Sequence, residues 1–151
     1  MQVTARVDYA VRALLELAAH PDRLVTRDEL ARAQSIPPRY LDVVLSQLRT
    51  GGLVLGQRGA SGGYRLGRPA ADISVAEVSR AVDGPLALVQ GQRPEQVHST
   101  GSSEHVRELW IGLRAALRSV MESVTIADLL SGDLPPPVRA LVDDPDAWQP
   151  R

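Results

Sequence analysis

Cysteine is absent from this chain of 151 residues, and so is lysine. Without cysteine the chain can form no disulfide and offers no thiolate to zinc or to an iron–sulfur cluster. No apolar run approaches the ~20 residues of a membrane-spanning helix, and Arg6, Asp8 and Arg12 interrupt the N-terminal apolar pattern, unlike in a signal peptide. With 44% apolar and 23% charged residues, the composition is typical of a soluble globular protein, which we expect in the cytoplasm.

The charges are segregated along the chain, although they nearly cancel to a net −1 at pH 7. Residues 1–68 carry ten arginines against six acids, a net of +4, whereas residues 69–151 carry seven arginines against twelve acids, a net of −5. This layout is expected if only the first half of the chain faces phosphate groups. The exclusive use of arginine either reflects genome composition or supplies guanidinium groups for phosphate and guanine.

Two short helices with a tight turn between them are predicted in the first half of the chain. The segment from Thr26 to Gln34 begins with a Thr-x-x-Glu capping box, formed by Thr26 and Glu29. From Pro37 to Thr50 one apolar stripe recurs at helical spacing, with polar residues on the other faces; the stripe consists of Leu41, Val44, Leu45 and Leu48. Such a pair is typical of a helix-turn-helix, whose second helix commonly enters the DNA major groove.

A two-stranded β-wing is predicted directly after the second helix. Gly51-Gly52 ends the helix, residues 53–55 are strand-like, residues 57–63 (QRGASGG) form a turn-rich tip, and residues 64–66 alternate back. The predicted fold class is therefore mainly α with a small β-wing, a winged helix-turn-helix domain followed by a long helix. The tip also satisfies the G-x-S-x-G pattern of a hydrolase nucleophile, but that motif requires a helix after the serine, and here a strand follows.

The most regular helical pattern of the chain runs from Glu104 to Val124. This length well exceeds the mean helix of ~11–12 residues, and a small winged domain gives such a helix little to lie along. We therefore expect it to pack against its twin in a homodimer. The residues of the predicted dimerisation stripe step by three and four along the helix: Val106, Leu109, Trp110, Leu113, Leu117, Val120, Met121 and Val124.

The remaining segments divide the chain into four parts. Helices are expected over Thr4–Ala19 and, opened by a capping box of Ser74 with Glu77, from Ser74 to about Val82. Both belong to a winged domain at residues 1–85, which a polar loop follows at residues 86–103. Residues 104–131 hold the dimerisation helix and a short helix that starts at Thr125, and residues 132–151 form a Pro- and Asp-rich tail, expected to be exposed or partly disordered.

Several short motifs follow one another along the chain. They are Asp8-Tyr9-Ala10, Ile36 with Tyr40-Leu41, Gly52-Leu53-Val54, Arg58-Gly59-x-x-Gly62-Gly63-Tyr64-x-Leu66, Ala81 to Leu86, Trp110, and Thr125 to Leu129. In these motifs the chain resembles the Rrf2 family of bacterial winged-helix transcription regulators, from Met1 to about Ser131. The resemblance implies a DNA-binding homodimer with the long helix as the dimer element, and we expect no enzymatic activity.

The chain departs from many members of that family between Leu86 and Trp110, where those members carry three cysteines that hold an iron–sulfur cluster. The resemblance is therefore to cluster-free members, and we expect no cofactor. Asp8 stands where some members use a carboxylate as an extra ligand; here we interpret it as a capping or salt-bridge group. The sequence leaves open whether one of three serines, Ser99, Ser102 and Ser103, replaces a native cysteine.

The predicted DNA-binding residues lie at the second helix of the motif and on the wing. They are Thr26, Pro38, Arg39, Tyr40, Asp42, Gln47, Arg49, Arg58, Gly59, Ser61, Gly62, Gly63 and Tyr64. Arg39 and Tyr40 occupy the first helical turn, which meets base edges or flanking phosphates. Asp42 either accepts a hydrogen bond from a cytosine amine or orients Arg39. Arg58 is expected in the minor groove, and the tip glycines allow the backbone to approach phosphate closely.

Three further hypotheses stand beside the prediction of DNA binding. The same fold can serve an adaptor that binds another protein and no DNA. A small molecule or a partner protein on the loop near His98 and His105 would change the separation of the two recognition helices. A metal site built from these histidines and Asp8 is disfavoured, because their spacing alone brings no three donors together.

Overall fold

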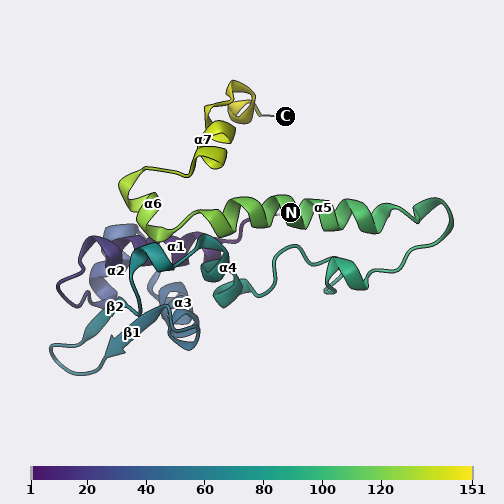
Figure 1. Cartoon of the computed structure of the whole chain (residues 1–151). Helices are drawn as coiled ribbons and strands as arrows, with labels where there is room; N and C mark the ends of the chain where they lie inside the picture. Colours follow the sequence, from purple (N-terminus) through teal and green to yellow (C-terminus); the bar gives the residue numbers. More distant parts are fainter. Residues whose placement is uncertain (1, 151) are drawn as a thin grey trace.

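The computed structural model describes residues 2–150, which form a mainly helical protein with one two-stranded antiparallel sheet (Figure 1). The helices and strands of this part of the chain are α1 (Ala5–Ala19), α2 (Arg27–Gln34), α3 (Pro38–Thr50), β1 (Val54–Gln57), β2 (Gly63–Leu66), α4 (Val75–Asp83), α5 (Val106–Ser123), α6 (Ile126–Ser131) and α7 (Pro136–Asp143). Short 3₁₀ turns are η1 (Ala70–Asp72), η2 (Pro94–Gln96), η3 (Gly101–Ser103) and η4 (Pro145–Trp148). The predicted fold class is confirmed.

Side-chain caps fix where several helices begin. The predicted capping boxes of Thr26 with Glu29 and of Ser74 with Glu77 are both present, and Thr125 forms a third with Asp128. In each box the backbone N–H of the cap residue donates to the carboxylate, and this bond is the main reason that the pKa values of Glu29, Glu77 and Asp128 lie below their ordinary values. These helix starts are therefore encoded locally.

Helix α1 lies at the centre of the core. Its face of Val7, Ala10, Ala13, Leu14 and Leu17 is buried, and it packs against α2, α3, α4 and α6. Small residues at positions 10 and 13 allow the neighbouring helices to approach closely. We call α1 to α4, the wing and α6 together the head.

Helix α6 joins this core even though it follows the long helix. Ile126 is fully buried among the core residues, and its backbone N–H donates to the carbonyl of Ile73 at 2.9 Å. The carbonyl of Val124 accepts from the backbone N–H of Val75, also at 2.9 Å. Helix α6 therefore packs as part of the head, although the division predicted from the sequence placed it with the dimerisation helix.

Helix α5 rests on the head only at its C-terminal end; the chain between α4 and α5 runs outward from the head alongside this helix (Figure 1). No residue of α5 is buried within the single chain. The tail is mostly exposed, which confirms the first of the two expected alternatives, and it contains α7, which starts at Pro136 and Pro137. The Trp148 indole N–H donates to the carbonyl of Val142 at 2.7 Å.

Candidate nucleic-acid interface

The recognition helix α3 is held by its inner face. Leu41, Val44, Leu45 and Leu48 are each at most 1% exposed, as the predicted stripe requires. On the outer face Arg39, Asp42, Ser46 and Arg49 are exposed, and so are Tyr40 and Val43, at 54% and 50%. Exposed aromatic and aliphatic side chains on an otherwise charged helix are suited to contact with base edges and thymine methyl groups.

The turn between α2 and α3 sets the angle of the recognition helix. Ser35 adopts a left-handed conformation (φ 52°) that ends α2, and buried Ile36 donates its backbone N–H to the carbonyl of Ala31 at 3.0 Å. Across the turn, Arg27 contacts Asp42 at 3.4 Å. Asp42 therefore pairs with Arg27 in the free protein. Neither of the two roles predicted for Asp42 involved Arg27.

An aromatic contact fixes the start of α3 to α1. The Tyr9 and Tyr40 rings meet edge to face, with centroids 6.0 Å apart, and the Arg12 guanidinium lies 5.7 Å from the centre of the Tyr9 ring. Asp8 holds Arg12 by an ion pair of 3.0 Å. The interpretation of Asp8 as a salt-bridge group is confirmed, and the contact chain positions the Tyr40 ring on the presented face.

The wing is built around its glycines. Strands β1 and β2 pair from Val54 opposite Leu66 to Gln57 opposite Gly63. A Cβ atom at Gly62 would lie 2.3 Å from the carbonyl oxygen of Gln57, so only glycine fits the turn. Gly62 therefore has a packing role inside the wing, and its role in the approach to phosphate stays a prediction.

The base of the wing is tied to the head, and its tip is free. Tyr64 and Val25 exchange backbone hydrogen bonds of 2.8 and 2.9 Å, and the half-buried Tyr64 ring packs against the core. Gly63 lies against Val25, since a Cβ there would come 2.9 Å from the Val25 carbonyl oxygen. At the other end Arg58, Gly59 and Ser61 are all exposed.

The charges of α3 and the wing are unbalanced. Residues 38–68 hold five arginines and one aspartate, a net of +4. Within the part of the chain that the structure describes, no carboxylate pairs with four of these arginines: Arg39, Arg49, Arg58 and Arg65. Elsewhere in the first half, Arg6, Arg12, Arg23 and Arg27 each have a carboxylate partner. Arg32, on α2, also lacks a carboxylate partner among the described residues, and its side chain donates to the backbone carbonyl of Asp28 at 3.3 Å. Most of the unpaired guanidinium groups of the first half therefore lie on α3 and the wing.

Some predicted residues are engaged inside the protein. The Gln47 side chain is half-buried and donates to the carbonyl of Val82 on α4 at 3.0 Å, so it joins two helices and does not face outward, which corrects its prediction as a DNA contact. Thr26 uses its hydroxyl in the capping box. The sequence prediction missed Arg65, although the alternation of residues 64–66 places it opposite Tyr64 and Leu66 on the exposed face of β2.

The predicted dimerisation stripe is divided between two faces of α5. Leu117 and Met121 line a concavity against α1 and α4, Trp110 lies half-buried beside residues 87–90, and Val124 is only 5% exposed. Those residues contact their own chain. Leu109 remains 61% exposed and Val106 37% exposed, while Leu113 is 37% exposed and also borders the concavity beside residues 87–90. Ile111, outside the predicted stripe, is likewise 37% exposed.

The alternative sites have no geometric support in the described residues. Ser61 lies at an exposed tip followed by β2, which is not the strand-to-helix turn of a hydrolase. Between residues 2 and 150, no three His, Cys, Asp or Glu side chains gather where they could hold a metal ion. His98 lies 2.9 Å from the carbonyl oxygen of Gln96, and His105 lies 3.5 Å from Glu108. Within residues 2–150, no helix is both long and apolar enough to cross a membrane.

A helix-turn-helix with an arginine-bearing wing and a presented, positively charged helix defines the class of winged helix-turn-helix DNA-binding proteins. The chain belongs to the Rrf2 family, described as iron-dependent transcriptional regulators, whose family model matches residues 3–132. The predicted resemblance is therefore confirmed.

Relatives of this chain are named as regulators. A "Putative HTH-type transcriptional regulator" of Mycobacterium tuberculosis is 44% identical over 145 residues, covering 95% of this chain and 90% of that protein. The HTH-type transcriptional regulator CymR of Bacillus subtilis is 32% identical over 132 residues, covering 87% and 91%. These names describe transcriptional regulators and not enzymes.

Solved structures agree with this assignment. The structure of CymR, the global cysteine regulator of B. subtilis, superposes with a TM-score of 0.74 at 31% identity, covering 87% of this chain and 98% of that one. IscR of T. potens superposes with a TM-score of 0.70 at 26% identity, covering 100% of this chain and 93% of that one.

The side chains of this protein do not fit an iron–sulfur cluster. Such clusters are held chiefly by cysteine thiolates, and the chain has none. Among the serines that stand between α4 and α5, Ser103 donates its hydroxyl to the carbonyl of Thr100 at 2.9 Å. Asp8, the other position that the resemblance suggested, is committed to Arg12.

Proposed function

We propose that the protein is a homodimeric transcriptional repressor that binds a pseudo-palindromic DNA site, with α3 in the major groove and the wing in the minor groove. The observation that carries this proposal is the gathering of unpaired arginines, Arg39, Arg49, Arg58 and Arg65, on α3 and the wing. Exposed guanidinium groups without carboxylate neighbours produce a positive potential that DNA phosphates satisfy.

The positions of these groups support the proposed placement in the grooves. Arg39 and Tyr40 are in the first turn of α3, the part of a recognition helix that meets base edges. The contact of Tyr40 with Tyr9 holds the ring in place before DNA arrives, which lowers the entropy lost on binding. Arg58 stands at the tip of a narrow two-stranded wing, a shape that suits insertion into a minor groove.

The proposal of a homodimer rests on α5. The helix spans 18 residues, or about 27 Å at 1.5 Å per residue, and buries none of them in its own chain. Its outward stripe of Val106, Leu109 and Leu113 is an apolar surface that an isolated chain leaves in water. A two-fold partner would cover this stripe and present two copies of α3 to successive major grooves, ~34–36 Å apart.

We also infer that the regulator acts without an iron–sulfur cluster, as the lack of thiolate ligands favours. Protein purified without oxygen from its native host should show no visible absorbance band of a cluster and no bound iron. An absorbance near the 400 nm region together with stoichiometric iron would contradict this part of the proposal.

Selection of genomic fragments tests the proposed function. Full-length protein is mixed with sheared DNA of the organism that encodes it, and the bound fragments are sequenced and footprinted. We expect one enriched site with two inverted half-sites, and a promoter carrying it should be more active when the gene for this protein is deleted. Enrichment without symmetry would contradict the dimer, and reduced promoter activity would contradict repression. Absence of any enriched fragment would instead favour a protein-binding adaptor.

A further inference from the structure

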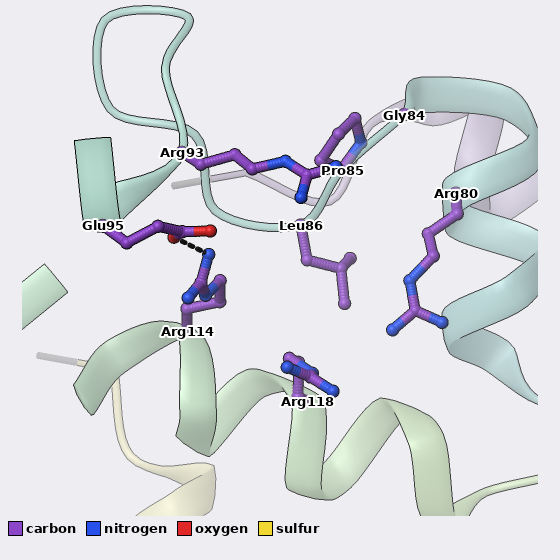
Figure 2. A pocket seen from close by; sticks show the side chains of 8 residues that line it. All are labelled: Arg80, Gly84, Pro85, Leu86, Arg93, Glu95, Arg114 and Arg118. Carbon is purple, nitrogen blue, oxygen red and sulfur yellow. Dashed lines mark hydrogen bonds and ion pairs between the residues drawn. The ribbon is translucent and has the colours of Figure 1, made fainter. Parts of the chain in front are cut away.

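Four arginines converge on a concavity between α4 and α5. Arg80 reaches it from α4, Arg93 from the segment before η2, and Arg114 and Arg118 from α5 (Figure 2). The cavity has a volume of about 440 Å³, and none of its lining residues belongs to α3 or to the wing. This surface is therefore separate from the one proposed to bind DNA.

The arginines of this cavity exceed the carboxylates that accompany them. Arg114 pairs with Glu95, while Arg80 and Arg118 both pair with Glu122. The Arg118 Nε atom lies 3.0 Å from Glu122 Oε1. Arg93 has no carboxylate partner within hydrogen-bonding distance among the described residues. Four guanidinium groups against two carboxylates leave a net charge of +2.

Both carboxylates stay ionised at neutral pH, so this balance persists. Hydrogen bonds from Arg118 and then Arg80 hold the pKa of Glu122 below its ordinary value. A backbone N–H is the largest cause of the lowered pKa of Glu95, followed by Arg114, and Arg93 adds a smaller favourable charge. The cluster therefore carries a net positive charge and has guanidinium N–H donors that no carboxylate accepts.

The lining combines these donors with an apolar patch. Leu86 lies among the four guanidinium groups, and Pro85 borders the same space (Figure 2). A volume of this order suits a small molecule, since ligand sites commonly occupy ~300–1,000 Å³. Guanidinium groups recognise carboxylate and phosphate oxygens through paired hydrogen bonds.

We propose that this cavity is an effector site for a compact dianion with a short carbon skeleton, a phosphate monoester or a dicarboxylate. The ligand's charge of −2 would neutralise the net positive charge of the four arginines and their two carboxylates. The carbon skeleton would lie against Leu86. This position differs from the expected effector position, because neither His98 nor His105 lines the cavity.

The site would couple to DNA binding through the elements that form it, and to that extent it rests on the proposed function. Arg80 belongs to the head, whereas Arg114 and Arg118 belong to α5. A dianion held by both helices favours one angle between head and α5, and hence one separation of the two recognition helices in a dimer. A ligand can shift such an equilibrium only by its difference in affinity for the two states.

Titration calorimetry on the DNA-free, full-length protein tests the site. The probes are glycerol 3-phosphate and succinate, with glycerol as the uncharged control, all at one ionic strength. Wild type should bind at least one dianion, and Arg93→Gln should weaken binding by about tenfold, the loss of one charge-assisted contact. Arg107→Gln is the matched control, because Arg107 is exposed on α5 and does not line the cavity.

The two probes separate the sources of the dianion, since preference for one identifies phosphate or carboxylate chemistry. Binding of neither probe would overturn the site. Equal binding by wild type, Arg93→Gln and Arg118→Gln would also overturn it, because the anions would then be associating with the general surface. Operator affinity that a saturating probe leaves unchanged would overturn the coupling. Because ligand binding is measured without DNA, its failure is distinguishable from a failure to bind DNA.

Discussion

Substitution of Leu109 by aspartate should dissociate the dimer and leave the subunit folded. Leu109 is 61% exposed on α5, so the carboxylate of the variant stays in water in a single chain. Complete burial of a leucine contributes about 1.5–3 kcal/mol, so covering the exposed part contributes about 1–2 kcal/mol per subunit. Two-fold symmetry doubles this to about 2–4 kcal/mol, and the two carboxylates add a desolvation penalty.

A total of at least about 4 kcal/mol corresponds to a thousandfold weaker dimer. Sedimentation equilibrium over a wide range of concentration measures this change, and circular dichroism checks that helix content is preserved. Arg107→Asp is the matched control, because Arg107 lies near Leu109 in sequence on a different face of α5. An unchanged dimer constant for Leu109→Asp, or a monomeric wild type, would refute the role given to α5.

Three further predictions concern the wing and the helix caps. Arg58→Ala should weaken operator binding by about 1–3 kcal/mol without changing the thermal midpoint, since Arg58 is exposed and unpaired; equal affinity by fluorescence anisotropy would remove it from the interface. Gly62→Ala should open the wing turn, lower operator affinity and preserve the core, with Ala60→Ser as a control at an exposed neighbour; a wild-type affinity would contradict the clash. The capping carboxylates Glu29, Glu77 and Asp128 have lowered pKa values, so they stabilise the fold above their ordinary values of 4.5 and 3.8, and urea midpoints should fall as the pH drops below that range; a midpoint independent of acid pH would contradict this.

Local signals made much of the head predictable. Capping boxes involve residues three apart, so Thr26 and Ser74 located two helix starts from sequence alone. The apolar stripe of α3 also required no knowledge of distant residues. The glycine-rich wing tip was predicted as a turn, while the specific need for glycine at position 62 depends on the carbonyl oxygen of Gln57.

Contacts between distant segments set the limit of prediction from sequence. Gln47 has the spacing of an outward residue, yet its donor bond goes to Val82, 35 positions later. The apolar stripe of α5 was predicted as one dimer surface, although Leu117 and Met121 face a concavity that the chain's own α1 and α4 border. The arginine-lined cavity draws residues from three separate segments, and no single stretch of sequence reveals it.

The salt dependence of operator binding tests the central claim most directly. The four arginines of α3 and the wing that lack a carboxylate partner in the described residues give eight in a dimer. If each displaces one counterion from DNA, log Kobs should fall against log salt concentration with a slope of about −7. Replacing both copies of Arg49 with alanine should make the slope about 2 units shallower if Arg49 contacts phosphate, with the Arg107→Ala protein unchanged. A slope near zero for the wild type would contradict the assignment of α3 and the wing as a DNA-binding surface.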